Sequence, residues 1–289
     1  MCLVLPHGWQ RSRFPRSGMA MLPAMTSPAR PNRAAAITAI ANQKGGVGKS
    51  TTTINLGAAL AFQGERVLLV DLDPQGNTSS GLGIDRTAIT ASTYDLLIED
   101  TPLEDVVEPT SVRDLFLVPA TIELAGAEIE LVSLFSREMR LAGALKTARE
   151  EYDVILIDCP PSLGLLTVNG LAAADEVMIP IQCEYYALEG VSQLMRNVKL
   201  VQQNLNPQLD VEGVVLTMFD GRTTLSTDVV DQVREHFGET AYRTVIPRTV
   251  RLSEAPSYGE PIEAFDPMSR GAIAYRELAR EYRRRHGRT

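Results

Sequence analysis

A glycine-rich segment near the start of the chain contains the residue types that bind phosphate. The stretch ANQKGGVGKSTTT, residues 41–53, follows a short apolar run and precedes a segment of helical character. Its glycines let the backbone close around a phosphate, and the N–H groups that open the following helix add the positive end of the helix dipole. Lys49 is expected to contact β- and γ-phosphate oxygens, and the hydroxyl of Ser50 is expected to bind Mg²⁺. The residues expected to hold a nucleotide in this loop are Lys44, Gly45, Gly46, Val47, Gly48, Lys49, Ser50 and Thr51.

The loop departs from the ordinary phosphate-binding pattern where it begins. That pattern starts with a glycine five positions before Gly48, but this chain has Gln43 there, followed by a second lysine, Lys44. One lysine and one metal ion already serve one nucleotide. Lys44 is therefore expected to have a further role, and contact with a different nucleotide would suit its charge.

Acidic residues at the ends of two apolar runs are candidates to complete a nucleotide site. LLVDLDPQGN, residues 68–77, contains Asp71 and Asp73, and VILIDCPPSLG, residues 154–164, contains Asp158. Ligands of open α/β sheets bind at the carboxyl ends of the strands, and strand alternation directs Asp71 and Asp73 to the same side. Asp158 has the position of a residue that holds Mg²⁺, usually through water.

Short apolar runs alternate with longer amphipathic stretches along the chain. The apolar runs predict strands that are buried on both faces, at 34–40, 66–71, 115–120, 153–158, 176–181, 211–218 and 242–247. The stretches between them predict helices at 49–64, 121–132, 136–151, 186–203 and 225–238. This alternation predicts an α/β fold with right-handed crossovers, in which a single doubly wound, mostly parallel sheet carries helices on both faces.

The length of 289 residues and the hydrophobic content of 44% allow one large domain with a substantial core. Neither an internal repeat nor a linker divides residues 34–289, which are predicted to form one domain around the phosphate-binding loop. Residues 1–33 mix proline, arginine and glycine and match a secretory signal poorly. They are expected to be a disordered leader or a mis-assigned start, since Met19, Met21 and Met25 are alternative start residues.

The composition limits the classes of function that the chain can have. A net charge of −8 and a pI near 5.1 argue against a generally basic surface, so contact with nucleic acid would need a local arginine cluster. The three cysteines form no CxxC pair and no metal-ligand spacing, which fits a reducing cytoplasm. No apolar run approaches the ~18 residues of a membrane span.

The segment KGGVGKST resembles the deviant Walker A motif of the ParA/MinD family of P-loop ATPases. The resemblance implies a Mg²⁺-dependent ATPase whose subunits pair face to face around two ATP molecules, with Lys44 contacting the partner's nucleotide. Residues 68–77 resemble the family's switch I, which implies that Asp73 positions the attacking water and Asp71 lies in the water shell of Mg²⁺. Residues 154–164 resemble switch II, which senses the γ-phosphate. Lys44, Lys49 and Asp73 are thus the expected catalytic residues, with Ser50, Asp71 and Asp158 at the metal.

The last third of the chain resembles one branch of this family. TMFDGRTTLSTDVVDQV (217–233) and YRTVIPRTVRLSEAPSYGEPI (242–262) are similar to blocks of the chromosome-partitioning ParA/Soj proteins. The similarity implies that Arg222 and Arg251 contact DNA phosphates without sequence preference, with Arg243 and Arg248 as further candidates.

Two residues of the same block match the adenine-side loop of the family. These are Pro247 and Thr249, and the family usually has asparagine at the second position. Contact with adenine through backbone groups would survive this difference, whereas a side-chain contact from Thr249 is not expected to follow the family.

The function that the resemblance implies is ATP-dependent segregation of a chromosome or plasmid. A nucleotide-dependent homodimer would bind non-specific double-stranded DNA, and a ParB/Spo0J-type centromere-binding protein would release it by stimulating hydrolysis of ATP to ADP. This predicts a cytoplasmic, nucleoid-associated protein without stable membrane association. Weak DNA binding by the monomer would become strong in the dimer because the number of bound phosphates doubles.

Three other functions fit the sequence less well. A MinD-like regulator of division-site placement would need a membrane-binding C-terminal helix, but Ile273, Leu278 and Tyr282 form a modest stripe better suited to packing on the sheet. A carrier of the nitrogenase iron-protein type would need cysteines at a dimer axis. A self-repressing plasmid ParA would need a DNA-reading domain larger than residues 1–33.

Overall fold

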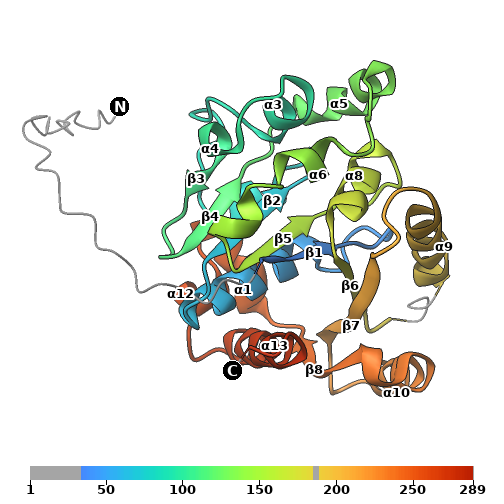
Figure 1. Ribbon diagram of the computed structural model, residues 1–289. Helices are drawn as coiled ribbons and strands as arrows, with labels where there is room; N and C mark the ends of the chain where they lie inside the picture. Colours follow the sequence, from blue (N-terminus) through green and yellow to red (C-terminus); the bar gives the residue numbers. More distant parts are fainter. Residues whose placement is uncertain (1–33, 185–188, 289) are drawn as a thin grey trace, which may run out of the picture. The chain divides into compact units, whose positions relative to one another are not determined.

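The apolar runs of the chain pair edge to edge in one eight-stranded sheet with the order β3-β4-β2-β5-β1-β6-β7-β8 (Figure 1). The computed structural model describes residues 34–184 and 189–288. Residues 1–33, for which a leader was predicted, lie outside this described part. The strands are β1 (Ala36–Ile40), β2 (Val67–Asp71), β3 (Glu108–Pro109), β4 (Leu115–Val118), β5 (Val154–Asp158), β6 (Glu176–Gln182), β7 (Asp210–Phe219) and β8 (Ala241–Pro247).

The strand prediction is confirmed for all seven predicted runs, and every pair among these strands is parallel. The eighth strand, β3, is the exception. It is only two residues long and pairs antiparallel with β4 at the edge of the sheet. A strand this short has no periodicity of its own, so the sequence pattern does not reveal it.

Helices cover both faces of the sheet, as the alternation of apolar runs predicts (Figure 1). Three short 3₁₀ segments add to the α-helices in the described residues: η1 (Leu131–Ser133), η2 (Gly238–Thr240) and η3 (Ala255–Tyr258). The α-helices are α1 (Lys49–Phe62), α2 (Asn77–Gly81), α3 (Thr93–Ile98), α4 (Leu103–Val106), α5 (Leu124–Glu130), α6 (Arg140–Ala144), α7 (Ala148–Glu151), α8 (Leu165–Ala173), α9 (Glu189–Asn204), α10 (Thr224–Phe237), α11 (Val250–Glu254), α12 (Ile262–Phe265) and α13 (Arg270–Arg285).

Side chains of each strand alternate between two apolar cores. In β2, Val67 and Leu69 join the core beneath α1, α12 and α13, whereas Leu68 and Val70 join the core beneath α3, α5, α8 and α9. All four side chains are fully buried. Burial on both faces explains why the strands are continuous apolar runs rather than alternating ones.

The helix prediction for residues 136–151 is wrong as a single element, because α6 and α7 are separate short helices. Ser136 has a φ of 51°, in the left-handed region, which a helix cannot continue through. At the start of α6, the N–H of Leu141 donates to Oδ1 of Asn169 on α8. These two features place the start of α6 after residue 136, and the second of them comes from a distant segment of the chain.

The C-terminal helix α13 packs its apolar side against α1 and β8. Leu278 and Tyr282 are fully buried, in agreement with the predicted stripe, and Tyr275 is buried beside them. Ile273 was predicted to belong to the same stripe, but it is 44% exposed because it lies on the outer side of the helix. The apolar face of α13 is therefore already used within the fold.

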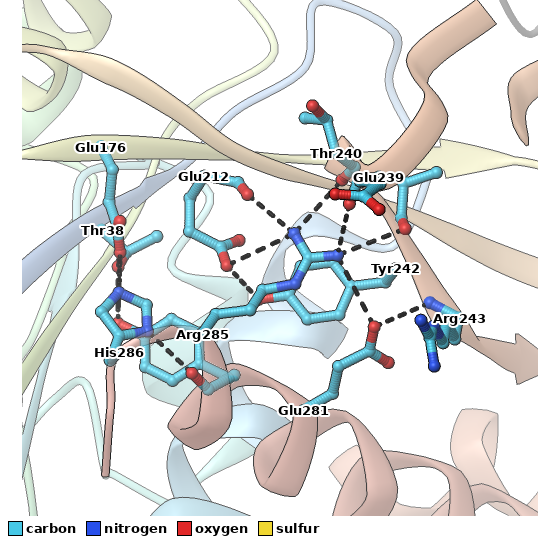
Figure 2. A network of polar contacts seen from close by, with 12 residues as sticks. Thr38, Glu176, Glu212, Glu239, Thr240, Tyr242, Arg243, Glu281, Arg285 and His286 are labelled. Carbon is cyan, nitrogen blue, oxygen red and sulfur yellow. Dashed lines mark hydrogen bonds and ion pairs between the residues drawn. The ribbon is translucent and has the colours of Figure 1, made fainter.

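Polar contacts hold the end of α13 at the amino ends of the central strands (Figure 2). The imidazole of His286 lies 2.7 Å from a carboxylate oxygen of Glu176. The guanidinium of Arg285 donates to the carbonyl of Glu212 and stacks 3.9 Å from the centroid of Tyr242. These contacts fix the C-terminal end of α13 near the amino ends of the strands. The glycine-rich loop lies at the opposite, carboxyl ends of the strands. In the described residues, no helix has the length and apolar character needed to cross a membrane.

Candidate nucleotide-binding site

The glycine-rich loop connects the carboxyl end of β1 to α1. Gly46 and Gly48 have φ values of 74° and 89°, which residues with a side chain rarely adopt. Neighbouring strands support the loop, because Thr217 Oγ1 on β7 donates to the carbonyl of Val47 at 2.8 Å and Asn42 donates to the carbonyl of Pro180 at 2.7 Å. Neither support is visible in the motif itself.

A cavity of about 460 Å³ lies against this loop and the start of α1. The structure brings the predicted phosphate-binding residues together here, with the exception of Val47, which is buried beneath the loop, and Lys44. The cavity is lined by Gly45, Gly46, Gly48, Lys49, Ser50, Thr51, Ile54, Asp73, Gln75, Asn77, Ser80, Gly81, Pro161, Met218 and Pro256. It opens at the N-terminus of a long helix, where phosphate oxygens can accept backbone N–H bonds.

Lys49 supplies a buried positive charge to the cavity. Its side chain belongs to the first turn of α1, and the residue is 7% exposed. Burial lowers the pKa of Lys49, while the charges of Asp158 and Asp73 oppose this shift. An ammonium group with so little water around it would gain strongly from a phosphate oxygen.

Asp158 has the features of a magnesium-linked carboxylate. It is fully buried at the end of β5, and its Oδ2 accepts a hydrogen bond of 2.7 Å from Thr78. Its Oδ1 is buried without a partner of good geometry in the described residues. Burial raises the pKa of Asp158, and the hydroxyls of Thr78 and Ser50 favour its ionised form. An orphaned carboxylate oxygen near the hydroxyl of Ser50 fits Mg²⁺ or its bound water.

Mg²⁺ at this position would depend on the nucleotide for most of its ligands. Among residues 34–184 and 189–288, no group of three or more acidic, histidine or cysteine side chains is arranged to hold a metal ion. Mg²⁺ in nucleotide sites is usually bound by one or two protein oxygens, phosphate oxygens and water. The residues present therefore fit a nucleotide-bound magnesium ion.

Asp71 lies opposite Asp158 on the neighbouring strand, but protein groups already surround its carboxylate. Its Oδ1 accepts from the N–H of Asp73, and its Oδ2 accepts from the N–H and the hydroxyl of Ser79 at 2.9 and 2.7 Å. Burial and the charge of Asp158 raise the pKa of Asp71. The contacts anchor α2 to β2, while the predicted place of Asp71 in the water shell of Mg²⁺ stays a prediction.

Asp73 is the acidic residue that lines the cavity from the end of β2. It is 6% exposed, and its Oδ1 accepts a hydrogen bond of 2.9 Å from the N–H of Gln75. One hydrogen bond from a turn leaves the carboxylate able to accept a proton or to orient a water molecule. Its predicted catalytic role is compatible with this position and stays a prediction.

Lys44 lies apart from the residues that line the cavity. Its Nζ is 3.8 Å from Oε2 of Glu184, and its side chain is 40% exposed. Its backbone N–H donates to Oδ1 of Asn42, so the backbone is held while the side chain remains accessible. Within one chain, the two lysines of the loop therefore occupy different environments.

The turn after Asp158 is tied to a helix that the motifs did not identify. Pro161 lines the cavity at the glycine-rich loop, and α8 begins shortly afterwards at Leu165. Glu128 of α5 accepts the N–H groups of Leu165 and Leu166, at 2.8 and 3.3 Å, and so caps the N-terminus of α8. A Cβ at Gly164 would come within 2.2 Å of the Glu128 carboxylate, so a larger residue there would displace this carboxylate from the start of α8.

A second cavity of about 350 Å³ adjoins the first, and the predicted adenine-side residues Pro247 and Thr249 line it. The hydroxyl of Thr249 accepts the N–H of Leu252 and caps α11, so this side chain has a structural contact of its own. Met218 lines both cavities with a φ of 53°, a strained value for a residue with a side chain. No sequence signal marks Met218, because methionine has no preference for this conformation.

The two predicted DNA-binding arginines follow the carboxyl ends of two adjacent strands. Arg222 comes after β7, and Arg251 lies on α11, which comes after β8. Arg222 is 89% exposed and forms two hydrogen bonds with the carboxylate of Asp220, at 2.8 and 2.6 Å. Arg251 contacts Glu254 and Asp266, each at 3.1 Å. Both arginines are accessible, and both have acidic partners in the free chain.

The described cysteines are structural. Cys159 and Cys183 are buried, and burial raises the pKa of both thiols, that of Cys183 to about 12. Thiols of this kind are poor nucleophiles and poor metal ligands.

The sheet, the glycine-rich loop and the adjoining cavities define a P-loop ATPase with a second lysine in its phosphate loop. Residues 35–211 match the family model described as an AAA domain. The chain is 59% identical over 245 residues to the sporulation initiation inhibitor protein Soj of Bacillus subtilis, covering 85% of this chain and 97% of Soj. It is 55% identical over 249 residues to the chromosome partitioning protein ParA of Myxococcus xanthus, covering 86% and 88%. The chain belongs to the ParA/Soj family of chromosome-partitioning ATPases.

A similar solved structure is described with nucleotide bound. It is named cobyrinic acid a,c-diamide synthase from Mycobacterium smegmatis and was solved with ADP and magnesium and with an ATP analogue and magnesium. It is 42% identical to this chain with a TM-score of 0.77, covering 88% of this chain and 97% of that one. The likeness confirms the predicted fold and places a magnesium nucleotide in a closely similar protein.

Proposed function

We propose that the protein is an ATP-dependent DNA-segregation ATPase in which nucleotide state, dimerisation and DNA binding form one switch. The observation that carries this proposal is the separation of two lysines on one phosphate loop. Lys49 is buried beside the cavity at the glycine-rich loop, whereas the side chain of Lys44 is 40% exposed and lies outside the lining of this cavity. The membership of the ParA/Soj family supports the same function.

ATP would bind with its phosphates against the glycine-rich loop and its adenine toward Pro247 and Thr249. Lys49 would neutralise phosphate oxygens, and Ser50 and Asp158 would hold Mg²⁺ directly or through water. Bound magnesium would supply positive charge that offsets the charge developing on the transferred phosphoryl group. Asp73 would orient the attacking water from the end of β2.

Lys44 would act on the nucleotide of a second chain. Within the part of the chain that the structure describes, its side chain pairs with an exposed acid, Glu184, at a distance typical of a weak surface pair. In a face-to-face dimer, the amine would reach the partner's phosphates and stabilise charge in the transition state. ATP would then hold two chains together, and hydrolysis would release them.

DNA would bind along the edge of the sheet where β7 and β8 end. Arg222 and Arg251 would contact DNA phosphates there without reading bases. Arg248, which is exposed between β8 and α11, would add a further positive charge. Arg243 lies at the start of β8, toward the opposite edge. A dimer presents twice the number of contacts, so DNA affinity would depend on ATP. A ParB-type partner would then trigger release from the nucleoid.

A MinD-like membrane function has less support. The apolar side chains of α13 that would face a bilayer, Tyr275, Leu278 and Tyr282, are buried against the rest of the chain. Arg283 and Arg288 contact Glu65 at 3.0 and 2.9 Å, so part of the basic end of the helix is also engaged.

Sedimentation with random-sequence DNA under ATP, ADP and no nucleotide tests the proposal. We expect retention of DNA with ATP only. Equal retention under all three conditions would rule out the nucleotide switch. Binding to anionic lipid vesicles in place of DNA would favour the MinD-like function instead.

A further inference from the structure

The turn that follows Asp73 is held by an arginine from outside the motif. The guanidinium of Arg86 donates to the carbonyl of Gln75 at 2.8 Å and to the carbonyl of Pro74 at 3.3 Å. These two carbonyls are successive in the chain, and the planar fork of a guanidinium can bind both at once. Arg86 therefore ties two points of one turn to a segment that follows eleven residues after Gln75.

The backbone that leads to Arg86 is tied to the end of α2. The N–H of Gly83 donates to the carbonyl of Ser80 at 3.0 Å, and the N–H of Ile84 donates to the carbonyl of Ser79 at 3.2 Å. The chain therefore turns back after α2 and brings Arg86 to the residues that precede this helix. Arg86 is partly buried in that place.

Gly76 lets the guanidinium lie close against the turn. This glycine is buried and has a φ of 64°, in the left-handed region. A Cβ at Gly76 would come within 2.8 Å of Cζ of Arg86. A side chain here would therefore push the guanidinium away from the two carbonyls. The sequence DPQGN shows the glycine, whereas its contact with Arg86 appears only in the fold.

The same turn sets the direction of the Asp73 carboxylate. The N–H of Gln75 donates to Oδ1 of Asp73 at 2.9 Å, and the N–H of Gly76 donates to the carbonyl of Asp73 at 2.8 Å. Asp73 and Gln75 line the cavity at the glycine-rich loop, and Arg86 lies outside this lining. Because Gln75 is exposed, packing does little to fix the turn, and the hydrogen bonds from Arg86 supply that restraint.

We propose that Arg86 is a positioning residue for ATP hydrolysis, which holds the turn at residues 73–76 so that the Asp73 carboxylate faces the attacking water. The inference rests on the proposed function, because it takes the role of Asp73 from it. Lys49 and Asp158, which would hold the phosphates and Mg²⁺, belong to α1 and β5. Loss of Arg86 should therefore slow hydrolysis while nucleotide binding and dimerisation persist. A displacement of about 1 Å near a reacting group can cost about 100-fold in rate.

Steady-state kinetics with ATP separate kcat from KM and so test this role. Arg86→Ala should lower kcat about tenfold and change KM by less than about twofold. Arg86→Lys should keep part of kcat, because an ammonium group reaches one carbonyl rather than two. The control is Arg113→Ala, at an arginine whose side chain is 95% exposed, and it should leave both constants unchanged. A normal kcat in Arg86→Ala would overturn the proposal.

Added guanidinium ion distinguishes lost positioning from lost folding. Arg86 lines a cavity of about 590 Å³, so a small planar cation can enter the space that Arg86→Ala leaves. Guanidinium, far below the concentrations that unfold proteins, should restore part of the turnover of this variant, and sodium at the same ionic strength should not. The Gln75 amide should exchange hydrogen faster in Arg86→Ala than in the wild type. An unchanged exchange rate at Gln75 would refute the restraint.

A double variant shows whether Arg86 acts through Asp73. In the Asp73→Ala background, Arg86→Ala should lower single-turnover hydrolysis no further, because the carboxylate that it positions is gone. A further tenfold loss would mean that Arg86 acts by another route and would overturn the proposal. Normal hydrolysis in Asp73→Ala alone would contradict the proposed function of Asp73, whereas the exchange of the Gln75 amide would still test the contact of Arg86 with the turn. None of these measurements needs DNA, so a protein that fails to bind DNA would contradict the proposed function without affecting this role.

Discussion

The ammonium nitrogen of Lys44 lies 3.8 Å from a carboxylate oxygen of Glu184, while Lys49, on the same loop, is buried near Asp158 and Asp73. Both side chains of this ion pair are about half exposed, and surface ion pairs of this kind contribute ~0–1 kcal/mol to stability. Lys44 can therefore leave Glu184 for a phosphate at small cost. The buried lysine has no such freedom, which is why the two amines suit two different nucleotides.

Replacing Lys44 by alanine separates nucleotide binding from dimerisation. Lys44→Ala should bind fluorescent ATP analogues within about twofold of the wild type, because Lys49 and the backbone of the loop remain. It should lose ATP-dependent dimerisation, and with it most ATP turnover. Analytical ultracentrifugation with ATP and a phosphate-release assay measure the two effects.

Glu184→Gln is the matched control, since it removes the charge that Lys44 contacts and keeps the amine. We expect this variant to dimerise as the wild type does. Normal turnover and dimerisation in Lys44→Ala would remove the proposed contact with the partner's nucleotide.

Replacing Asp73 by alanine should trap the ATP-bound dimer. Loss of a group that orients water lowers turnover by about 100-fold or more, while Lys49, Ser50 and Asp158 still hold the nucleotide. The dimer should accumulate on DNA with ATP, as gel shifts would reveal. Asp85→Ala, at an acid outside the cavity, should hydrolyse ATP normally. A normal rate in Asp73→Ala would show that another group orients the water.

Combined replacement of Arg222 and Arg251 by alanine should abolish DNA retention with ATP and leave basal ATP turnover intact. Each lost phosphate contact lowers the slope of log affinity against log salt by about one. The control replaces Arg234 and Arg243, near the amino end of β8, and should retain DNA. Full retention by the first variant would mean that DNA binds another surface.

Asp220 should restrain DNA binding, because it occupies the guanidinium of Arg222. Two hydrogen bonds of 2.8 and 2.6 Å join the two side chains, and Arg222 strongly lowers the pKa of Asp220. Asp220→Asn removes the competing charge, so DNA affinity with ATP should rise severalfold, and more at low salt. An unchanged salt titration would show that Arg222 contacts no phosphate.

The sheet and the phosphate loop could be predicted from the sequence because their signals are local. Seven apolar runs correspond to seven strands, and Gly46 and Gly48 of the loop adopt the left-handed conformation that glycine favours. The predicted phosphate-binding residues other than Lys44 and Val47 line one cavity because a strand, a turn and a helix follow one another directly in the chain. Those signals do not depend on distant residues.

Features that depend on distant contacts could not be predicted in this way. Asn169 caps α6, Glu128 caps α8, and Thr217 supports the phosphate loop from β7. Each of these hydrogen bonds joins residues that are at least 28 positions apart. Asp71 shows the same limit, because its position at the end of a strand can be predicted from the sequence, whereas its hydrogen bonds to Ser79 appear only in the fold.

The contacts at the end of α13 predict that stability falls as the pH rises (Figure 2). Burial raises the pKa of Glu212 from 4.5 to about 7, with the charge of Glu176 acting in the same direction and Tyr242 and Arg285 opposing it. Burial alone would lower the pKa of His286, but its hydrogen bond to Glu176 raises it. For both groups a raised pKa in the folded state means that stabilisation is present at low pH and is lost as pH rises through the raised value.

Glu212→Gln tests this, because a neutral amide keeps the shape of the side chain and cannot ionise. A shift from 4.5 to about 7 corresponds to on the order of 3 kcal/mol, so the free energy of unfolding of the wild type should fall relative to the variant by up to that amount between pH 4.5 and pH 8. Urea unfolding at several pH values measures the difference, and Glu239→Gln, an exposed neighbour, should follow the wild type. Parallel curves for Glu212→Gln and the wild type would mean that Glu212 is ionised in the folded protein throughout, and that its contacts with Tyr242 and Arg285 outweigh its burial.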